Sequence, residues 1–279
     1  MTLTAYNHVP LPSFVYGTAW KKEATAQLVQ LAVASGFTAI DTANQLIHYQ
    51  EALVGEALRA LEKKGVKRDA LFLQTKFTSV DGQGGRPPYD PAADLTTQVR
   101  QSFDSSLMHL GTDYVDSYVL HAPFSRRRLG EADGEVWAAM EEIYRSGKTK
   151  MIGISNVAAD QLVDLCEQAN VKPMVVQNRC FAALGWDQEV RAICQANGIV
   201  YQGFSLLTAN RDVLADPEIR AIAGRLGATP AQIVFRFAMQ IGMLPLTGTT
   251  SERHMKEDLQ ADRLELSAAE IQWIETIAL

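Results

Sequence analysis

Residues 36–77 read GFTAIDTANQLIHYQEALVGEALRALEKKGVKRDALFLQTKF. Short runs rich in β-branched and aromatic residues at 37–43 and 71–77 predict two strands, and the amphipathic segment 51–63 between them predicts a helix. Two strands joined through a helix are parallel, because the helix returns the chain to the starting edge of the sheet. The stretch therefore predicts a β-α-β unit.

The same alternation continues on both sides of this unit. Six more strand-like runs lie at 14–19, 114–121, 150–155, 173–178, 199–205 and 243–248. Further helical patterns lie at 22–35, 92–110, 134–146, 158–169, 187–197, 216–226 and 230–241. Eight strand–helix units in one chain predict an α/β fold of the (β/α)8 class, a TIM barrel.

Capping residues mark the ends of the predicted helices. Glycines of the kind that end helices stand at Gly36, Gly65, Gly111, Gly147, Gly198 and Gly242. Thr229-Pro230-x-Gln232 and Ser267-x-x-Glu270 are capping boxes, and the second opens a last helix. We therefore expect a single domain over residues 1–279, a barrel with a C-terminal helix.

A doubly wound open sheet is the competing architecture. Such a sheet usually has a glycine-rich phosphate-binding turn, G-x-G-x-x-G, after an early strand. The first strand-like run ends instead in Gly17-Thr18-Ala19-Trp20. The barrel is therefore favoured over the open sheet.

Composition narrows the class of protein. The 279 residues are 47% hydrophobic and carry a formal charge of −6, so no basic field favours nucleic acid or an anionic membrane as a partner. No apolar run approaches the roughly 18 residues of a membrane span, and no signal peptide is evident. The three cysteines are scattered, as is typical of reduced thiols. We expect a cytoplasmic monomer that acts on a small molecule.

Four polar residues fall where barrel active sites are built, at the carboxyl ends of strands. Asp41, Lys76 and His121 end the second, third and fourth predicted strands, and Tyr49 follows the second. A lysine in a buried strand needs a charged partner, for which Asp41 is the natural candidate. A tyrosine hydroxyl has a pKa near ~10, which a neighbouring ammonium would lower. With His121 bonded to a substrate oxygen, the group suits carbonyl reduction with Tyr49 as proton donor.

The chain resembles the aldo-keto reductases. The resemblance is carried, in family order, by GFTAIDTANQLIHYQEALVGEAL, LFLQTKF, DYVDSYVLHAP, GKTKMIGISN, VVQN, GFSLL and TGTTSERHMKEDL. It implies an oxidoreductase that interconverts a carbonyl and an alcohol, with Asp41, Tyr49, Lys76 and His121 as a catalytic tetrad. It also implies NADPH or NADH as cofactor, bound without a Rossmann domain, and no metal.

The same resemblance implies which residues hold the cofactor. At the nicotinamide and pyrophosphate these are Ser155, Asn156, Gln177, Phe204, Ser205 and Leu207. At the first two strand ends and in the last loop they are Gly17, Thr18, Asp41, Gly248, Thr249, Thr250, Arg253, His254, Glu257 and Asp258.

The position of the tyrosine departs from the family pattern. The family usually places its tyrosine five residues after the aspartate, and Leu46 has that position here. Tyr49 lies eight residues after Asp41, and the neighbouring His48 is the alternative occupant of the proton-donor position. Tyr49 is preferred because only it offers a phenol.

Two further departures bear on substrate and cofactor. Ala122 stands where many members carry tryptophan, so we expect a wider substrate pocket, with Trp20 and Phe124 as its remaining apolar wall. Gly248-Thr249 replaces a lysine-serine pair near the 2′-phosphate, and Arg253 or His254 is left to bind that phosphate. NADPH is preferred, with NADH as the alternative.

Two other functions stay open at this point. A barrel that binds the cofactor but serves as a regulatory or protein-binding partner would share these motifs. A metal-dependent barrel hydrolase would use Asp41, His48 and His121 as ligands, although the five histidines are scattered and form no H-x-H or H-E-x-x-H pair.

Overall fold

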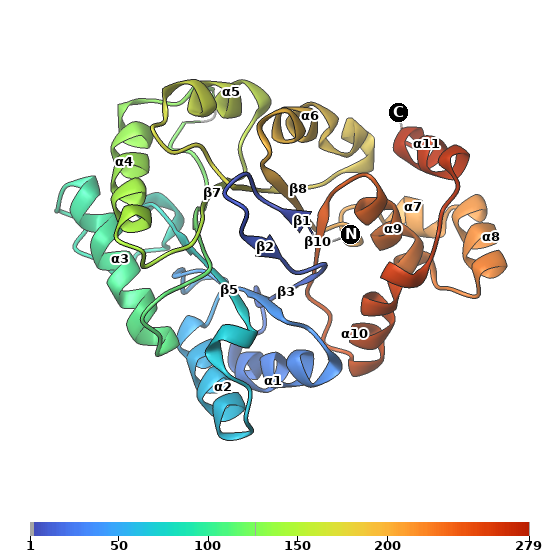
Figure 1. Ribbon diagram of the computed structural model, residues 1–279, viewed down its shortest axis with the longest axis horizontal. Helices are drawn as coiled ribbons and strands as arrows, with labels where there is room; N and C mark the ends of the chain where they lie inside the picture. The colour runs from blue at the N-terminus through green and yellow to red at the C-terminus, as the bar shows by residue number, and fades with distance from the viewer. Residues whose placement is uncertain (1–2, 126, 279) are drawn as a thin grey trace.

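The computed structural model describes residues 3–125 and 127–278, and the predicted domain bounds at 1 and 279 lie outside them. Eight parallel strands close into a barrel in the order β10-β3-β4-β5-β6-β7-β8-β9 (Figure 1). Their bounds are β3 Val15–Gly17, β4 Ala39–Asp41, β5 Phe72–Phe77, β6 Ser117–Leu120, β7 Ile152–Ser155, β8 Val175–Arg179, β9 Val200–Phe204 and β10 Leu244–Thr247. Each predicted strand overlaps one of these, with β8 ending one residue beyond the predicted 178, so the closed barrel is confirmed and the open sheet is wrong.

Helices surround the barrel as an outer ring (Figure 1). They are α1 Thr25–Ser35, α2 Glu51–Lys63, α3 Leu95–Leu110, α4 Glu131–Arg145, α5 Ala159–Gln168, α6 Gln188–Asn197, α8 Pro217–Leu226 and α9 Pro230–Gln240. Gly111 and Gly198 end α3 and α6 in the left-handed conformation, with φ of 67° and 65°, which a residue without a Cβ adopts at little cost. The predicted helices are therefore confirmed.

Side-chain caps move two helix starts away from the predicted positions. The Asp94 carboxylate accepts a hydrogen bond from the Thr97 backbone N–H at 2.7 Å, so α3 begins at Leu95 rather than at 92. The Asp133 carboxylate accepts from the Gly130 backbone N–H at 2.9 Å, so α4 begins at Glu131 rather than at 134. Both caps satisfy backbone donors that the first helical turn leaves free.

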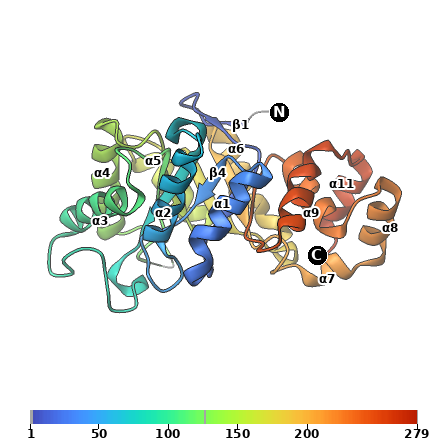
Figure 2. The same cartoon turned by 90° about the horizontal axis from the view of Figure 1, so that it is seen from below.

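Elements beyond the eight units complete the fold. Helices α7 Arg211–Ala215, α10 Glu252–Leu259 and α11 Ala268–Thr276 lie near α8 and α9 on one flank of the barrel (Figure 2). The sequence pattern does not predict α7, because five residues are too few to show a helical period. It also misses a hairpin of β1 Leu3–Thr4 and β2 Pro10–Leu11, whose strands are too short to alternate.

The hairpin covers the amino-terminal end of the barrel (Figure 1). The side chains inside the barrel form layers above the hairpin. Leu11 and Ala5 pack on an apolar layer made by the first residues of six strands: Val15, Ala39, Phe72, Val175, Val200 and Leu244. Side chains two residues further along a strand face the same way. That next layer contains Asp41, Gln74, Gln177 and Gln202, all buried. The barrel is thus apolar at one end and polar toward the other.

Trp186, just before α6, holds the C-terminal helix in place. Its indole is completely buried, and its Nε1 donates to the Ile274 carbonyl in α11 at 2.9 Å. Its ring lies 5.0 Å from that of Phe237 in α9. One side chain therefore connects α6, α9 and α11.

We expect Trp186→Phe to lower the free energy of unfolding by about 2 kcal/mol, because it removes the indole N–H from a buried carbonyl and leaves a small void. Urea denaturation would measure the change. Trp273→Phe, on the same C-terminal helix but partly exposed, is the control and should cost less than about 1 kcal/mol. Equal losses in the two variants would contradict the assigned role of Trp186.

Candidate active site

A buried ion pair lies at the centre of the site. Lys76 at the end of β5 is 0% exposed, and its Nζ lies 2.6 and 2.7 Å from the two carboxylate oxygens of Asp41 at the end of β4. A third bond runs from Nζ to the Thr42 carbonyl at 2.8 Å. The three donors of the ammonium thus have three acceptors. The strand register brings the two residues together because β4 and β5 are neighbours in the barrel.

Tyr49 and His121 flank this ion pair. Lys76 Nζ lies 5.1 Å from the centre of the Tyr49 ring, and the Tyr49 and His121 rings are 5.9 Å apart in an edge-to-face arrangement. His121 Nδ1 is hydrogen-bonded to the Thr78 hydroxyl at 2.7 Å, and its Nε2 has no hydrogen-bond partner among residues 3–125 and 127–278. All four residues of the predicted tetrad therefore meet in one place.

The structure distinguishes His48 from Tyr49 by position. The His48 ring stacks on Trp20, with ring centres 4.1 Å apart, and the Trp20 backbone N–H donates to the His48 carbonyl at 2.6 Å. Trp20 is 65% exposed, so this stacked pair forms part of the rim. The longer loop after β4 therefore places the phenol, and not the imidazole, beside Lys76.

The electrostatics of Tyr49 differ from the expectation. Burial, and then the charge of Asp41, raise the pKa of Tyr49 above its usual value, whereas the sequence predicted a lowering by Lys76. That prediction is wrong, because burial of the phenol is the larger effect and the Asp41 carboxylate adds to it. Burial and then the Lys76 charge lower the pKa of His121 to about 3. At neutral pH the site therefore contains a protonated phenol beside a neutral imidazole.

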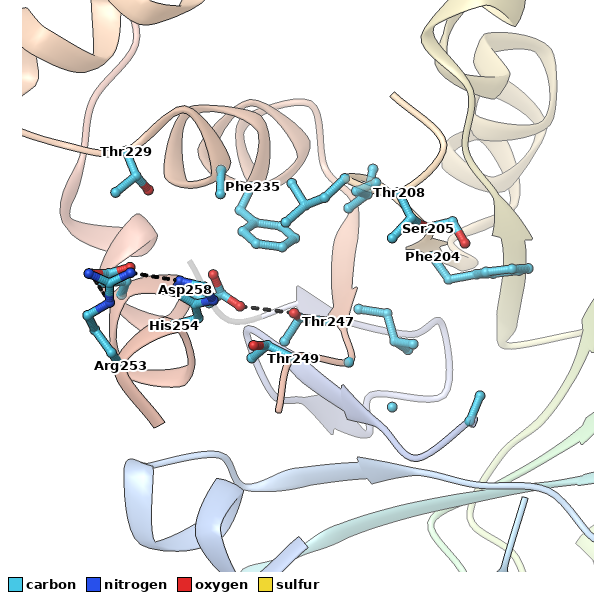
Figure 3. Close-up of a pocket in the computed structure, with 18 residues that line it drawn as sticks. Phe204, Ser205, Thr208, Thr229, Phe235, Thr247, Thr249, Arg253, His254 and Asp258 are labelled. Atoms are coloured by element: carbon cyan, nitrogen blue, oxygen red, sulfur yellow. Dashed lines mark hydrogen bonds and ion pairs between the residues drawn. The ribbon is translucent and has the colours of Figure 1, made fainter. Parts of the chain in front are cut away.

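Ten of the expected cofactor residues line a cleft of about 520 Å³ (Figure 3). Those that line it are Gly17, Phe204, Ser205, Leu207, Gly248, Thr249, Arg253, His254, Glu257 and Asp258. Thr18 is buried, and its hydroxyl donates to the Asp41 carbonyl at 2.9 Å. Thr250 is exposed and is not part of the lining. Thr18 therefore supports the Asp41 backbone from outside the cleft.

At the ends of β7 and β8, outside the lining of this cleft, Ser155, Asn156 and Gln177 are bonded to one another. Asn156 Nδ2 donates to the His121 carbonyl at 2.9 Å and to Ser155 Oγ at 3.1 Å, and Ser155 Oγ donates to the Gln177 carbonyl at 2.5 Å. Among the described residues, no group donates to Asn156 Oδ1 or to Gln177 Oε1. Two free acceptors near Phe204 fit the amide N–H groups of a nicotinamide carboxamide.

One end of the cleft carries mixed charge. Arg253 and His254 project there from α10, and Arg253 Nε lies 3.6 Å from Glu257 (Figure 3). Ser251 caps α10 by accepting from the His254 backbone N–H at 3.4 Å, and backbone donors at a helix start favour a phosphate. The basic side chains and the helix start fit the adenosine phosphate of NADPH, and the acidic residues fit hydroxyl groups.

Several residues of the site were missed in the sequence. Lys21 donates to the Gly248 carbonyl across the cleft, and Thr78 orients His121. The sequence feature that could have identified Lys21 is its place directly after the turn at Gly17–Trp20, close to where the cofactor phosphates are expected. Gln74 and Gln202 were also missed, although each is a polar residue inside an otherwise apolar strand run, where burial demands hydrogen-bond partners.

The three predicted substrate residues lie at the mouth of the barrel. Ala122 follows His121 directly and is exposed, and Phe124 is 39% exposed. Leu46 and Ile47 in the loop before Tyr49 add exposed apolar surface of 51% and 47%. The rim beside His121 is therefore lined by Trp20, Phe124 and a small alanine.

Metal ligation and membrane spanning were tested over residues 3–125 and 127–278. Their histidine, cysteine and acidic side chains form no group of three that could hold a metal ion. Asp41 and His121, two ligands of the hydrolase alternative, are bonded to Lys76 and Thr78 instead. Within the same residues, each helix is too short or too polar to cross a bilayer.

Comparison with known proteins agrees with this geometry. The model of the aldo/keto reductase family matches residues 14–278. An aldo-keto reductase family 4 member from Arabidopsis thaliana is 32% identical over 269 residues, covering 89% of this chain and 80% of the relative. The NADPH-dependent alpha-keto amide reductase of Saccharomyces cerevisiae is 29% identical over 299 residues, covering 100% and 90%.

A solved structure has the same architecture. The crystal structure of an aldo/keto reductase from Brucella melitensis superposes with a TM-score of 0.85 and is 25% identical, covering 100% of this chain and 99% of that one. The family match extends over nearly the whole barrel and includes every strand that carries a tetrad residue. The chain therefore belongs to the aldo/keto reductase family.

Proposed function

We propose that this oxidoreductase reduces an aldehyde or ketone with NADPH and that Tyr49 donates the proton. The observation that carries the proposal is the position of the Tyr49 phenol, beside Lys76 and His121. When bound, a reduced nicotinamide supplies the hydride. The residues of this chain supply the proton, the orientation and the electrostatic environment.

Tyr49 and Lys76 divide the proton chemistry between them. Because the pKa of Tyr49 is raised, its hydroxyl holds a proton at neutral pH and can act as an acid. As the carbonyl carbon is reduced, negative charge develops on the substrate oxygen, and the O–H proton of Tyr49 moves to that oxygen. The phenolate that remains would be stabilised by the nearby Lys76 ammonium. Burial lowers the pKa of Lys76, and its contact with Asp41 opposes that shift.

His121 orients the carbonyl group. We assign the Thr78 hydroxyl as the donor to Nδ1. In that tautomer the neutral imidazole carries its proton on Nε2 and can donate it to the substrate oxygen. The low pKa of His121 keeps it out of the proton-donor role, because it has no second proton to give at neutral pH. Tyr49 as acid and His121 as hydrogen-bond donor thus have separate tasks.

Substrate and cofactor preferences follow from the two ends of the cleft. The rim formed by Trp20, Phe124 and Ala122 supports an apolar carbonyl substrate. Because Ala122 is small, that substrate can be bulkier than one that would fit if position 122 were a tryptophan. Arg253 and His254 support NADPH through its additional phosphate, and a relative is NADPH-dependent by name. NADH is the alternative cofactor.

Tyr49→Phe should lower kcat by about 10²- to 10⁴-fold, the usual contribution of a general acid, with the NADPH dissociation constant within twofold of wild type. Absorbance of reduced nicotinamide with a panel of aldehydes and ketones, together with fluorescence titration, would measure both. Tyr114→Phe is the matched control, since Tyr114 lies before β6 and contacts Arg68 and Lys150.

Three results would count against this assignment. Full turnover by Tyr49→Phe would move the proton donor elsewhere, with His48 as the first residue to test. Binding of NADPH by the wild type without turnover of any carbonyl would favour the regulatory alternative. Absence of nucleotide binding would overturn the proposed function.

Arg253→Ala should raise the NADPH dissociation constant about tenfold and the NADH constant less than twofold, because only NADPH has a 2′-phosphate to receive the charge-assisted bond. Fluorescence titration of both nucleotides would measure the ratio. Arg263→Ala, an exposed arginine outside the cleft, is the control. Equal weakening of both nucleotides would show that Arg253 does not read the phosphate.

Asp258 introduces a pH dependence at the same end of the cleft. It is buried, its Oδ2 accepts from the Thr247 hydroxyl at 2.9 Å, and burial raises its pKa to about 7 from 3.8. Between these two values the folded protein binds the proton more tightly than the unfolded chain does. The contribution of Asp258 to stability is therefore present below pH 4 and is lost as the pH rises to about 7.

Asp258→Asn should remove this dependence. In wild type we expect the ionisation of Asp258 to lower the free energy of unfolding as the pH rises from 4 to 7, by at most about 1.4 kcal/mol per pH unit. Urea denaturation of both proteins at several pH values would isolate it as a difference. Parallel pH profiles would contradict the raised pKa.

A further inference from the structure

We propose that Gln202 and Gln74 are positioning residues that fix the amide of Gln177, so that Gln177 presents its carbonyl oxygen to the N–H of a nicotinamide carboxamide. The proposal rests on the proposed function, because it concerns how the cofactor is read. It goes beyond that function in assigning a task to two glutamines inside the barrel.

The three glutamines and Asp41 form one closed network. Gln74 Nε2 donates to Asp41 Oδ1 at 2.8 Å and to Gln202 Oε1 at 2.9 Å. Gln177 Nε2 donates to the same two oxygens, at 3.1 and 2.9 Å. Gln202 Nε2 returns a bond to Gln74 Oε1 at 3.1 Å. The side-chain carbonyl of Gln202 therefore accepts a hydrogen bond from each of the two amide groups that donate to Asp41.

Strand register places these side chains at one level of the barrel. Asp41 pairs with Gln74 between β4 and β5, and Gln177 pairs with Gln202 between β8 and β9. Gln74 and Gln202 are 0% exposed and Gln177 is 3% exposed. Buried amides must be hydrogen-bonded, and the bonds of this network account for their orientation.

The network leaves Gln177 only one good amide orientation. An ionised carboxylate accepts hydrogen bonds and donates none, so the group that faces Asp41 must be Nε2. The other contact of Nε2 is the Gln202 carbonyl oxygen, which is also only an acceptor. A flipped Gln177 would place Oε1 against two acceptors at once and lose two bonds, each worth about 1 kcal/mol or more when buried.

The consequence reaches the cofactor cleft. With both Nε2 protons used inside the barrel, Gln177 has only Oε1 left, and among the described residues nothing donates to it. Ser155, whose hydroxyl bonds the Gln177 backbone carbonyl, lies at the same strand ends. Gln177 thus offers a hydrogen-bond acceptor. That acceptor matches the N–H of a nicotinamide carboxamide and does not match a methyl group at the same position of the cofactor. Gln202 and Gln74 act on the cofactor through Gln177 without touching it.

The test compares two nucleotides that differ at this group. The 3-acetylpyridine analogue of NADP⁺ replaces the carboxamide by an acetyl group, so it keeps the carbonyl and lacks the N–H. Protein fluorescence titration would give both dissociation constants for wild type, Gln202→Met and Gln74→Met. Methionine has a similar length and fills the space without amide bonds.

Wild type should bind NADP⁺ about tenfold more tightly than the analogue, and the ratio should fall to about twofold in Gln202→Met, as expected for the loss of one hydrogen bond. Gln74→Met should lower the ratio in the same direction. Gln98→Met is the control: Gln98 is also buried, but it bonds the Ala93 carbonyl beside α3 and should leave the ratio unchanged.

The selectivity ratio separates positioning from general destabilisation, because a loosened barrel weakens both nucleotides alike. An unchanged ratio in a folded Gln202→Met, or equal affinity of wild type for the two nucleotides, would overturn the proposal. If the Gln202 variant fails to fold, Gln74→Met gives the same test. Binding without selectivity would leave the proposed function intact, whereas no binding of either nucleotide would overturn the function as well.

Discussion

The buried ion pair between Lys76 and Asp41 is the interaction on which the rest of the site depends. Removing two charges from water costs several kcal/mol per ion, and the cost is recovered only when every donor and acceptor is bonded. Here Lys76 has three acceptors, and Asp41 receives further bonds from Gln74 and Gln177. The pair can persist in the barrel because the surrounding strands satisfy it completely.

This pair also explains why Tyr49 is a protonated acid in the resting protein. A free ammonium beside the phenol would favour the phenolate, but Asp41 lies in contact with Lys76 and offsets its field. Burial then decides the direction of the pKa. The same burial removes the charge from His121, so two groups that both titrate in water have separate protonation states here. A proton donor and a neutral hydrogen-bond donor can then work side by side.

The layered interior connects the fold to the chemistry. The apolar layer closed by the amino-terminal hairpin supplies stability, and the glutamine layer above it supplies orientation. Gln177 belongs to the polar layer of the barrel interior, where its amide bonds Asp41, and it lies on the strand β8 that neighbours β9 and Phe204. Phe204 lines the cleft in which we propose that the cofactor binds, so the buried ion pair and that cleft are connected through two neighbouring strands.

The sequence by itself determined the eight-stranded barrel and selected three polar residues at strand ends, because strand and helix periods and the ends of strands are local properties. Asp41, Lys76 and His121 could be selected since each is a polar residue at the end of an apolar run. Only the tertiary structure decided that Tyr49 rather than His48 lies beside Lys76, and that burial reverses the expected pKa shift. Thr78, Lys21, Gln74 and Gln202 emerged only there, because hydrogen bonds between strands distant in the chain depend on barrel register, which no local pattern encodes.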